Sequence, residues 1–325
     1  MRSPITFSLA ALSCLGLLFG CGTDPATQTE TSTSSPVTPE ATTPQQEPLK
    51  ITVSVLPQQY FVEKIGGDRV QVSTLVGPGM EAESYEPKPQ QLKDLSDADA
   101  YVGIGIFFEE VWGDRLRSAN GNMTWLDTSE GIEKLPLADH HHHGDDDHSH
   151  DHNHDHEGEL LDPHIWLSPQ RVKQQAESIY QLLVQLDPDG ETIYANNLNQ
   201  FLVELDQLDQ TIRERLAPLE NRTFLVFHPA WGYFANDYGL EQLSIEVEGQ
   251  EPSAAELAEL VKIAQEKQIR TIFVQYQFNI QAAEAIAQEI NAEVVPLDPL
   301  APNWSENMLA MTDEFIQASR PNPTE

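Results

Sequence analysis

Apolar runs of strand length alternate with amphipathic stretches in the part of the chain that starts at Leu49. In the first half, the strand-like runs are 51–57, 70–79 and 100–106. Residues 57–67 have a helical pattern that ends at two glycines, and residues 168–187 have another, with Ser168 well placed to be its N-cap. Alternation of this kind predicts parallel βα units.

The longest helical pattern runs from Asp189 to Pro218 without an internal proline. Its apolar residues recur at helical spacing, at Tyr194, Leu198, Phe201, Leu202, Leu205, Leu208, Ile212 and Leu216. Roughly 28 residues that each rise about 1.5 Å would form a rod of about 40 Å. Because one small domain does not need so long a helix, we expect it to connect two lobes.

A second set of strands and helices is predicted after this connector. The strand-like runs are 223–229, 243–249, 271–277 and 293–299, and the helical patterns are 231–239, 253–268, 282–290 and 308–316. Ser253 and Glu256 form a capping-box pattern. The predicted fold class is therefore α/β, with two βα lobes whose sheets are mainly parallel, joined by one long rigid helix. The predicted bounds are 49–187 for the first lobe with a loop at 138–159, 188–218 for the helix and 219–325 for the second lobe.

The first 48 residues have a different composition. Residues 1–20 carry one positive charge before a short apolar run, which predicts a secretory signal rather than a membrane-spanning helix. The sequence LFGC resembles a bacterial lipobox and favours Cys21 over Cys14 as a lipidated residue; a plain secretory signal is the alternative. Residues 21–48 are rich in Thr, Ser and Pro and predict a flexible tether. We therefore expect a lipid-anchored protein on the outer side of the cytoplasmic membrane, in the periplasm or at the cell surface.

The net charge of the chain excludes some kinds of binding partner. With 18 Lys and Arg against 52 Asp and Glu, the formal net charge is -34. Such a surface repels nucleic acid and anionic lipid headgroups, while it attracts cations. Both cysteines precede the folded part, which therefore has no disulfide framework.

Nine of the eleven histidines lie in the tract 140–156, which contains no hydrophobic residue. They are His140, His141, His142, His143, His148, His150, His152, His154 and His156. Neutral imidazole binds borderline metals, and the neighbouring aspartates attract cations. We expect a tract that is disordered without metal and binds several ions weakly. A solvated acidic spacer is the alternative; an expression tag does not fit an internal, interleaved sequence.

Two histidines remain outside the tract, and each adjoins a proline at a predicted element boundary. They are His164 in DPHIWLSP and His228 in FHPAWGYF, and Asp298 in VVPLDPL has the same placement. Ligands in α/β proteins gather at the carboxyl ends of strands. All three are therefore candidate metal ligands, although Asp298 could equally be a turn residue before Pro299.

Several motifs together resemble one family. YEPKPQQL, DPHIWLSP, FHPAWGYFANDYGL, VEGQEPSAAEL and LDPL follow the lipobox and tether in this order. The chain is similar to the ZnuA-type zinc-binding components of bacterial ABC transporters, from Leu49 to the C-terminus. The resemblance implies a metal in the cleft between two lobes, closure of the lobes around it, and no enzymatic activity. It also implies that the protein, which we expect to be a monomer, delivers Zn²⁺ to an ABC permease and its ATPase.

The resemblance also implies a ligand set of His164, His228 and Asp298, with one departure. Glu83, in GMEAESYEPKP, stands where the family usually has a histidine. Because a carboxylate can bind zinc at about 2.0–2.2 Å, Glu83 is the predicted fourth ligand. Water, Glu81 or a tract histidine could take its place.

Three other functions are alternatives to zinc uptake. Two imidazoles and two carboxylates also suit manganese or iron uptake, because ligand type alone discriminates weakly between these metals. A zinc hydrolase needs an open coordination position, and the chain has no H-E-x-x-H motif. A metal-scavenging adhesin that works without a permease is a further alternative.

Overall fold

The computed structural model describes residues 47–137, 160–246, 252–278 and 280–320. Contacts divide the chain into two units, Met1–Gln45 and Gln46–Glu325, and the fold described below belongs to the second. The predicted signal sequence, Cys21 and the nine tract histidines lie outside the described residues.

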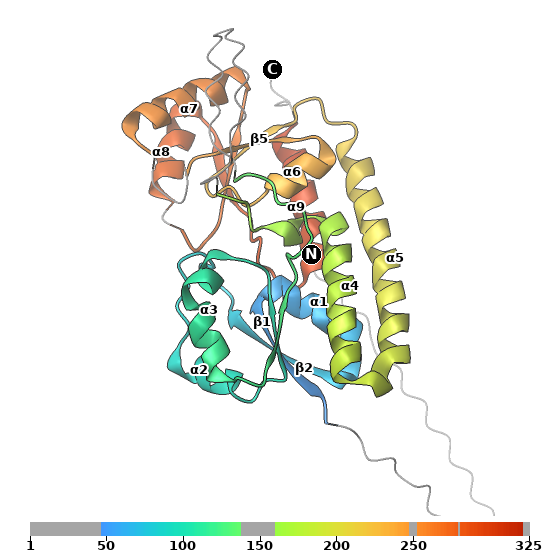
Figure 1. Cartoon of the computed structure of the whole chain (residues 1–325). Helices are drawn as coiled ribbons and strands as arrows, with labels where there is room; N and C mark the ends of the chain where they lie inside the picture. Colours follow the sequence, from blue (N-terminus) through green and yellow to red (C-terminus); the bar gives the residue numbers. More distant parts are fainter. Residues whose placement is uncertain (1–46, 138–159, 247–251, 279, 321–325) are drawn as a thin grey trace, which may run out of the picture. The chain divides into compact units, whose positions relative to one another are not determined.

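The helices and strands alternate along most of the chain (Figure 1). The strands are β1 (Leu49–Val55), β2 (Val70–Val76), β3 (Ala100–Gly103), β4 (Thr124–Asp127), β5 (Thr223–Val226), β6 (Glu241–Ser244), β7 (Thr271–Val274) and β8 (Glu293–Pro296). The α-helices are α1 (Leu56–Gly66), α2 (Pro89–Leu95), α3 (Phe107–Ala119), α4 (Pro169–Leu186), α5 (Glu191–Leu216), α6 (Gly232–Tyr238), α7 (Ala254–Glu266), α8 (Gln281–Ile290) and α9 (Trp304–Ala318). Short 3₁₀ helices span Gly67–Arg69, Ile165–Leu167 and Pro188–Gly190.

The strands form two four-stranded parallel sheets with the same strand order. The first is β2-β1-β3-β4 and the second is β6-β5-β7-β8. Two parallel sheets with their helices, joined by the long helix α5, confirm the predicted fold class. In each sheet the order reverses beside the first strand, and ligands of α/β proteins bind at the carboxyl ends of strands near such a point.

The long helix is anchored at its start by a tight turn. Ser168 is the N-cap of helix α4, and its hydroxyl accepts the N–H of Arg171. Helix α4 lies beside α5 (Figure 1). Between the two helices, the carboxylate of Asp187 accepts a hydrogen bond from the Tyr194 hydroxyl at 2.6 Å. A Cβ atom at Gly190 would lie 2.5 Å from the Tyr194 ring, so this turn requires glycine. The two helices therefore form one rigid hairpin.

Several strands end before their predicted last residue, because the chain leaves the sheet there. The strands predicted over 100–106, 243–249 and 271–277 end at Gly103, Ser244 and Val274. After β3, Gly105 turns the backbone with a φ of 72°, a conformation that favours glycine. The buried carboxylate of Glu109 accepts the N–H groups of Ile104 and Gly105 at 3.1 and 2.7 Å. The residues after the strands therefore form loops at the sheet edge.

One hydrophobic core continues from the first lobe into the second. The ring of Trp304 on α9 packs edge-on against Phe61 on α1, with 5.1 Å between centroids. The Trp304 indole donates to the carbonyl of Trp166, and the Trp166 indole donates to that of Pro299, both at 2.8 Å. The outer face of the second sheet packs against α7 and α8 in a separate core (Figure 1).

Replacing Trp304 by alanine should lower the free energy of unfolding by about 3–5 kcal/mol, because it removes a fully buried ring from this shared core. Urea unfolding of the metal-free protein measures the loss. Trp112→Ala is the matched control: this ring is half-buried on α3 and should cost less than about 2 kcal/mol. Equal losses in the two variants would show that the core does not depend on Trp304.

Candidate metal centre

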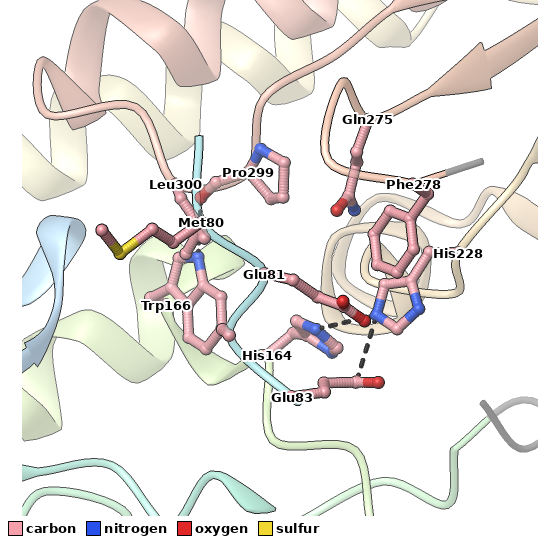
Figure 2. A pocket seen from close by; sticks show the side chains of 11 residues that line it. Met80, Glu81, Glu83, His164, Trp166, His228, Gln275, Phe278, Pro299 and Leu300 are labelled. Carbon is pink, nitrogen blue, oxygen red and sulfur yellow. Dashed lines mark hydrogen bonds and ion pairs between the residues drawn. The ribbon is translucent and has the colours of Figure 1, made fainter. Parts of the chain in front are cut away.

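Three of the predicted ligands meet at one point, although they come from distant parts of the sequence. One ligand atom from each of Glu83, His164 and His228 lies within 4.8 Å of the other two. The His228 Nε2 atom lies 3.2 Å from Glu83 Oε1 and 3.3 Å from His164 Nε2 (Figure 2). Two nitrogens and a carboxylate oxygen at this separation can bind a single metal ion.

His228 lies just beyond the carboxyl end of β5. Its Nδ1 atom lies 2.7 Å from a carboxylate oxygen of Glu246, which follows β6. The ring also stacks on Phe278, with centroids 4.9 Å apart and planes 16° apart. Only 4% of His228 is exposed. The carboxylate therefore fixes the ring so that Nε2 faces Glu83 and His164, an arrangement typical of metal-binding histidines.

His164 is held in the same way by a different carboxylate. Its Nδ1 atom lies 2.7 Å from Asp162 Oδ1, which also accepts the backbone N–H of His164 at 2.8 Å. The carbonyl of Asp162 accepts a hydrogen bond from the Tyr233 hydroxyl in the second lobe. A contact between the lobes therefore supports the position of His164.

Glu83 lies in the loop between β2 and α2, and a neighbouring tyrosine anchors this loop. The Tyr85 hydroxyl donates to Gln91, whose amide donates to the carbonyl of Leu75 at the end of β2. The Tyr85 ring packs edge-on against Phe108, 5.2 Å away. Glu83 keeps 26% of its side chain exposed, so it is the most accessible of the three ligands.

The metal-free centre carries a proton where a cation would bind. Burial lowers the pKa of His228, but its hydrogen bonds to Glu246 and Glu83 outweigh burial and raise the pKa to about 10. Burial raises the pKa of Glu83, but the hydrogen bond and charge of His228 outweigh it, so this pKa is lowered. An ion pair between His228 and two carboxylates therefore occupies the position that a metal ion would take.

Asp298, the remaining predicted ligand, is not part of the three-residue group. Its carboxylate accepts the backbone N–H of Leu300 at 2.9 Å, and its carbonyl accepts from Asn307 at 2.7 Å. The next two residues, Pro299 and Leu300, do line the cavity beside the histidines. This hydrogen bond uses only Oδ1, one of the two carboxylate oxygens, so it does not prevent the Asp298 side chain from binding an ion.

The cavity beside the ligands has a volume of about 20 Å³, which suits one ion or one water molecule. Its apolar wall comes from Met80, Ala82, Trp166, Phe278, Pro299 and Leu300. Glu81 and Gln275 are the other polar residues that line it. An apolar shell around few polar groups controls the access of solvent to a metal site.

Sequence reasoning missed the residues that orient the histidines. Asp162 precedes His164 by two residues in DPH, and Glu246 directly precedes the VEG motif, so a motif-based prediction could have included both. Gln275 and Phe278 carry no local signal, because only the ending of β7 beside β5 brings them to His228.

Comparisons with known proteins agree with this geometry. The profile of the family described as "ZnuA: Zinc-uptake complex component A periplasmic" matches residues 51–321. The "High-affinity zinc uptake system protein ZnuA" of Bacillus subtilis is 31% identical over 256 residues, which are 78% of each chain. The "Manganese-binding lipoprotein MntA" of Halalkalibacterium halodurans is 29% identical, over 76% of this chain and 78% of that one.

A solved structure gives a closer likeness. The crystal structure of a ZnuA deletion mutant with zinc bound is 46% identical to this chain. It superposes with a TM-score of 0.77, over 85% of this chain and 100% of that one. Because the family profile covers nearly all of the described residues, the chain belongs to the ZnuA family of periplasmic components of zinc-uptake complexes.

Proposed function

We propose that this protein captures Zn²⁺ outside the cytoplasmic membrane and delivers it to the permease of an ABC uptake system, which its ATPase drives. The observation that carries this proposal is the convergence of two buried Nε2 atoms and the Glu83 carboxylate within 4.8 Å. Tetrahedral zinc accepts imidazole nitrogen and carboxylate oxygen at similar distances. No chemical change of the ion is needed, and members of this family are transport components rather than enzymes.

His164, His228 and Glu83 are the proposed ligands, and each has a distinct part. The histidines present fixed nitrogens, because Asp162 and Glu246 hold their other ring atoms. Glu83 comes from the more exposed loop and neutralises one of the two positive charges. Asp298 stays the predicted fourth ligand, through the carboxylate oxygen that does not accept the N–H of Leu300.

Manganese uptake is the second candidate, and the carboxylate of Glu83 favours it. Carboxylate and water ligands suit manganese, whereas imidazole suits zinc. Two fully oriented imidazoles in a small cavity with an apolar wall favour zinc, and the similar ZnuA crystal structure holds zinc. The manganese-binding relative from Halalkalibacterium halodurans keeps the alternative worth testing.

A zinc hydrolase is a poorer fit than a binding protein. Hydrolysis needs space for a substrate next to the metal, and the cavity of about 20 Å³ admits one small group. A scavenging adhesin would need no permease, whereas the family to which this chain belongs forms uptake complexes.

The N-terminal segments and the histidine tract complete the proposal. Within the described residues, no helix combines the length and apolar character needed to span a bilayer. We propose a lipid on Cys21 as the membrane anchor, a monomeric body, and a tract at 140–156 that collects exchangeable metal near the main site. Its nine imidazoles and its aspartates support this role.

Metal analysis and competition titration test this function. The full chain should bind one zinc ion tightly and several more weakly, whereas a variant without 140–156 should keep only the tight ion. Zinc should displace manganese from the tight site, because two imidazole ligands favour it. Stoichiometric manganese without preference for zinc would reject zinc uptake. Loss of the tight ion on deletion would instead place a tract histidine in the site.

A further inference from the structure

Helix α6 begins with a glycine that leaves room for Asp162, the residue that orients His164. A Cβ atom at Gly232 would lie 2.6 Å from Asp162 Oδ2, much closer than two unbonded atoms can approach. The φ angle of Gly232 is not positive, so the backbone conformation itself does not require glycine. The requirement is therefore one of space, because any side chain at this position would overlap the carboxylate.

The carboxylate of Asp162 cannot move aside without releasing His164. Only 1% of Asp162 is exposed. Its Oδ1 atom accepts the backbone N–H of His164 at 2.8 Å and lies 2.7 Å from the ring Nδ1. Because both oxygens belong to one planar group, a rotation that takes Oδ2 away from a new methyl group also takes Oδ1 away from the histidine ring.

The next residue of α6 fixes the backbone of Asp162. The hydroxyl of Tyr233 donates to the Asp162 carbonyl at 2.7 Å and accepts the N–H of Leu135 at 3.1 Å. Tyr233 is fully buried, and the guanidinium of Arg171 lies 4.4 Å from the centre of its ring. The first two residues of α6 therefore contact both the side chain and the backbone of Asp162.

The same short segment carries the other histidine ligand. Gly232 follows His228 by four residues, and between them the N–H of Trp231 donates to the Gln242 side chain at 2.7 Å. The Nε2 atoms of His164 and His228 lie 3.3 Å apart in the metal-free protein. One rigid segment thus holds both rings, although the two histidines come from different lobes.

We propose that Gly232 and Tyr233 are positioning residues for metal binding, which fix His164 relative to His228 by holding Asp162 at the start of α6. This inference rests on the proposed zinc-binding function. Because the arrangement is formed before the ion arrives, neither imidazole has to be reoriented when zinc binds, and such preorganisation favours high affinity.

Gly232→Ala tests this role in an untagged variant without 140–156, which keeps only His164 and His228. Competition with a chelator should show zinc affinity about 10- to 100-fold weaker, the loss expected when a metal-binding histidine loses the group that orients it. Gly113→Ala is the matched control, because a Cβ atom at this position of α3 would have no atom of the described residues within 4 Å. Its zinc affinity should equal that of the parent.

Nuclear magnetic resonance of the ring nitrogens provides a measurement without metal. In the parent, the neutral His164 ring should carry its proton on Nδ1, which faces Asp162, and leave Nε2 free for the ion. In Gly232→Ala this tautomer should no longer predominate, whereas Gly113→Ala should keep the spectrum of the parent. Unchanged His164 signals in a folded Gly232→Ala variant would overturn the proposal.

A double variant shows whether the new methyl group acts through Asp162. In the Asp162→Ala background, Gly232→Ala should weaken zinc binding by less than about twofold further, because the group that it displaces is already gone. A further loss as large as that in the parent would mean that the methyl group acts by shifting α6, and would reject the proposed role of Asp162.

Tyr233→Phe removes the other hydrogen bond to Asp162 without adding an atom, so it tests the role even if Gly232→Ala does not fold. It should weaken zinc binding about fivefold and change the same ring signals. Affinity and signals equal to those of the parent would overturn the proposal. If the parent binds zinc tightly in that case, the proposed function stands. If the parent itself does not bind zinc, the proposed function is wrong as well.

Discussion

Replacing His228 by alanine should weaken zinc binding by about 10² to 10³-fold. Structural zinc sites gain about 10–16 kcal/mol from four ligands, so one ligand accounts for about 3–4 kcal/mol. His164→Ala should have a similar effect, because both rings are fixed by a buried carboxylate and lose little freedom when the ion binds. Competition with a chelator of known affinity measures the change in the variant without 140–156.

A control variant and a stability measurement distinguish a variant that has lost a metal ligand from one that has lost its fold. His148→Ala, in the full chain, removes one of nine tract imidazoles and should leave the tight site unchanged. The His228→Ala variant leaves Glu246 buried without its partner, so its metal-free stability must be compared with that of the parent. Tight zinc binding by a folded His164→Ala, His228→Ala double variant would refute the assignment of the centre.

Zinc affinity should rise about tenfold for each pH unit between about 6 and 9. The pKa of His228 is raised to about 10 in the metal-free protein, so its ring carries a proton across this range. The ion needs the neutral Nε2 atom and must displace that proton. The lowered pKa of Glu83 keeps this carboxylate ionised, so it adds nothing to the slope. Calorimetry in buffers of different ionisation enthalpy should detect one proton released from His228 per zinc bound.

The same pKa shift predicts an opposite trend for the metal-free protein. Because the folded value lies above the ordinary value of 6.5, protonated His228 stabilises the fold fully below pH 6.5, and this contribution is lost as the pH rises toward 10. Glu246→Gln removes one of the two carboxylates that raise the pKa and should make the pH dependence of zinc binding shallower. A zinc affinity that does not change between pH 6 and 9 would contradict the assigned protonation.

Local sequence predicted the helices and strands whose apolar residues recur at regular spacing. It also predicted the two histidine ligands that adjoin prolines. The helix α5 has its apolar residues at regular spacing, and seven of the eight predicted positions are buried. His164 directly precedes a 3₁₀ helix and His228 follows the end of β5, so both lie at element boundaries, as expected from their place in the sequence. These features depend on residues that are close in the sequence, so they can be predicted from one sequence alone.

Other features depend on contacts between distant segments. The pattern of apolar residues did not predict α2, α3 and β4, which lie between residues 89 and 127. In these short elements, polar and apolar residues are mixed on each face, so the apolar residues show no regular spacing. The strand predicted over 271–277 ends at Val274, since Gln275 and Phe278 turn toward His228. Asp298 has the same placement as His164 in sequence, but it lies outside the group formed by Glu83, His164 and His228, and such distances depend on the fold.

The core that Trp304 shares with Phe61 bears on how fast metal can be exchanged. If the lobes had to separate for zinc to leave, this indole would have to be drawn out of its apolar surroundings and lose its bond to the carbonyl of Trp166. Displacing the half-exposed loop that carries Glu83 breaks far fewer contacts. Release at the permease would then be governed by a local loop motion, and the body of the protein would pass through each transport cycle almost unchanged.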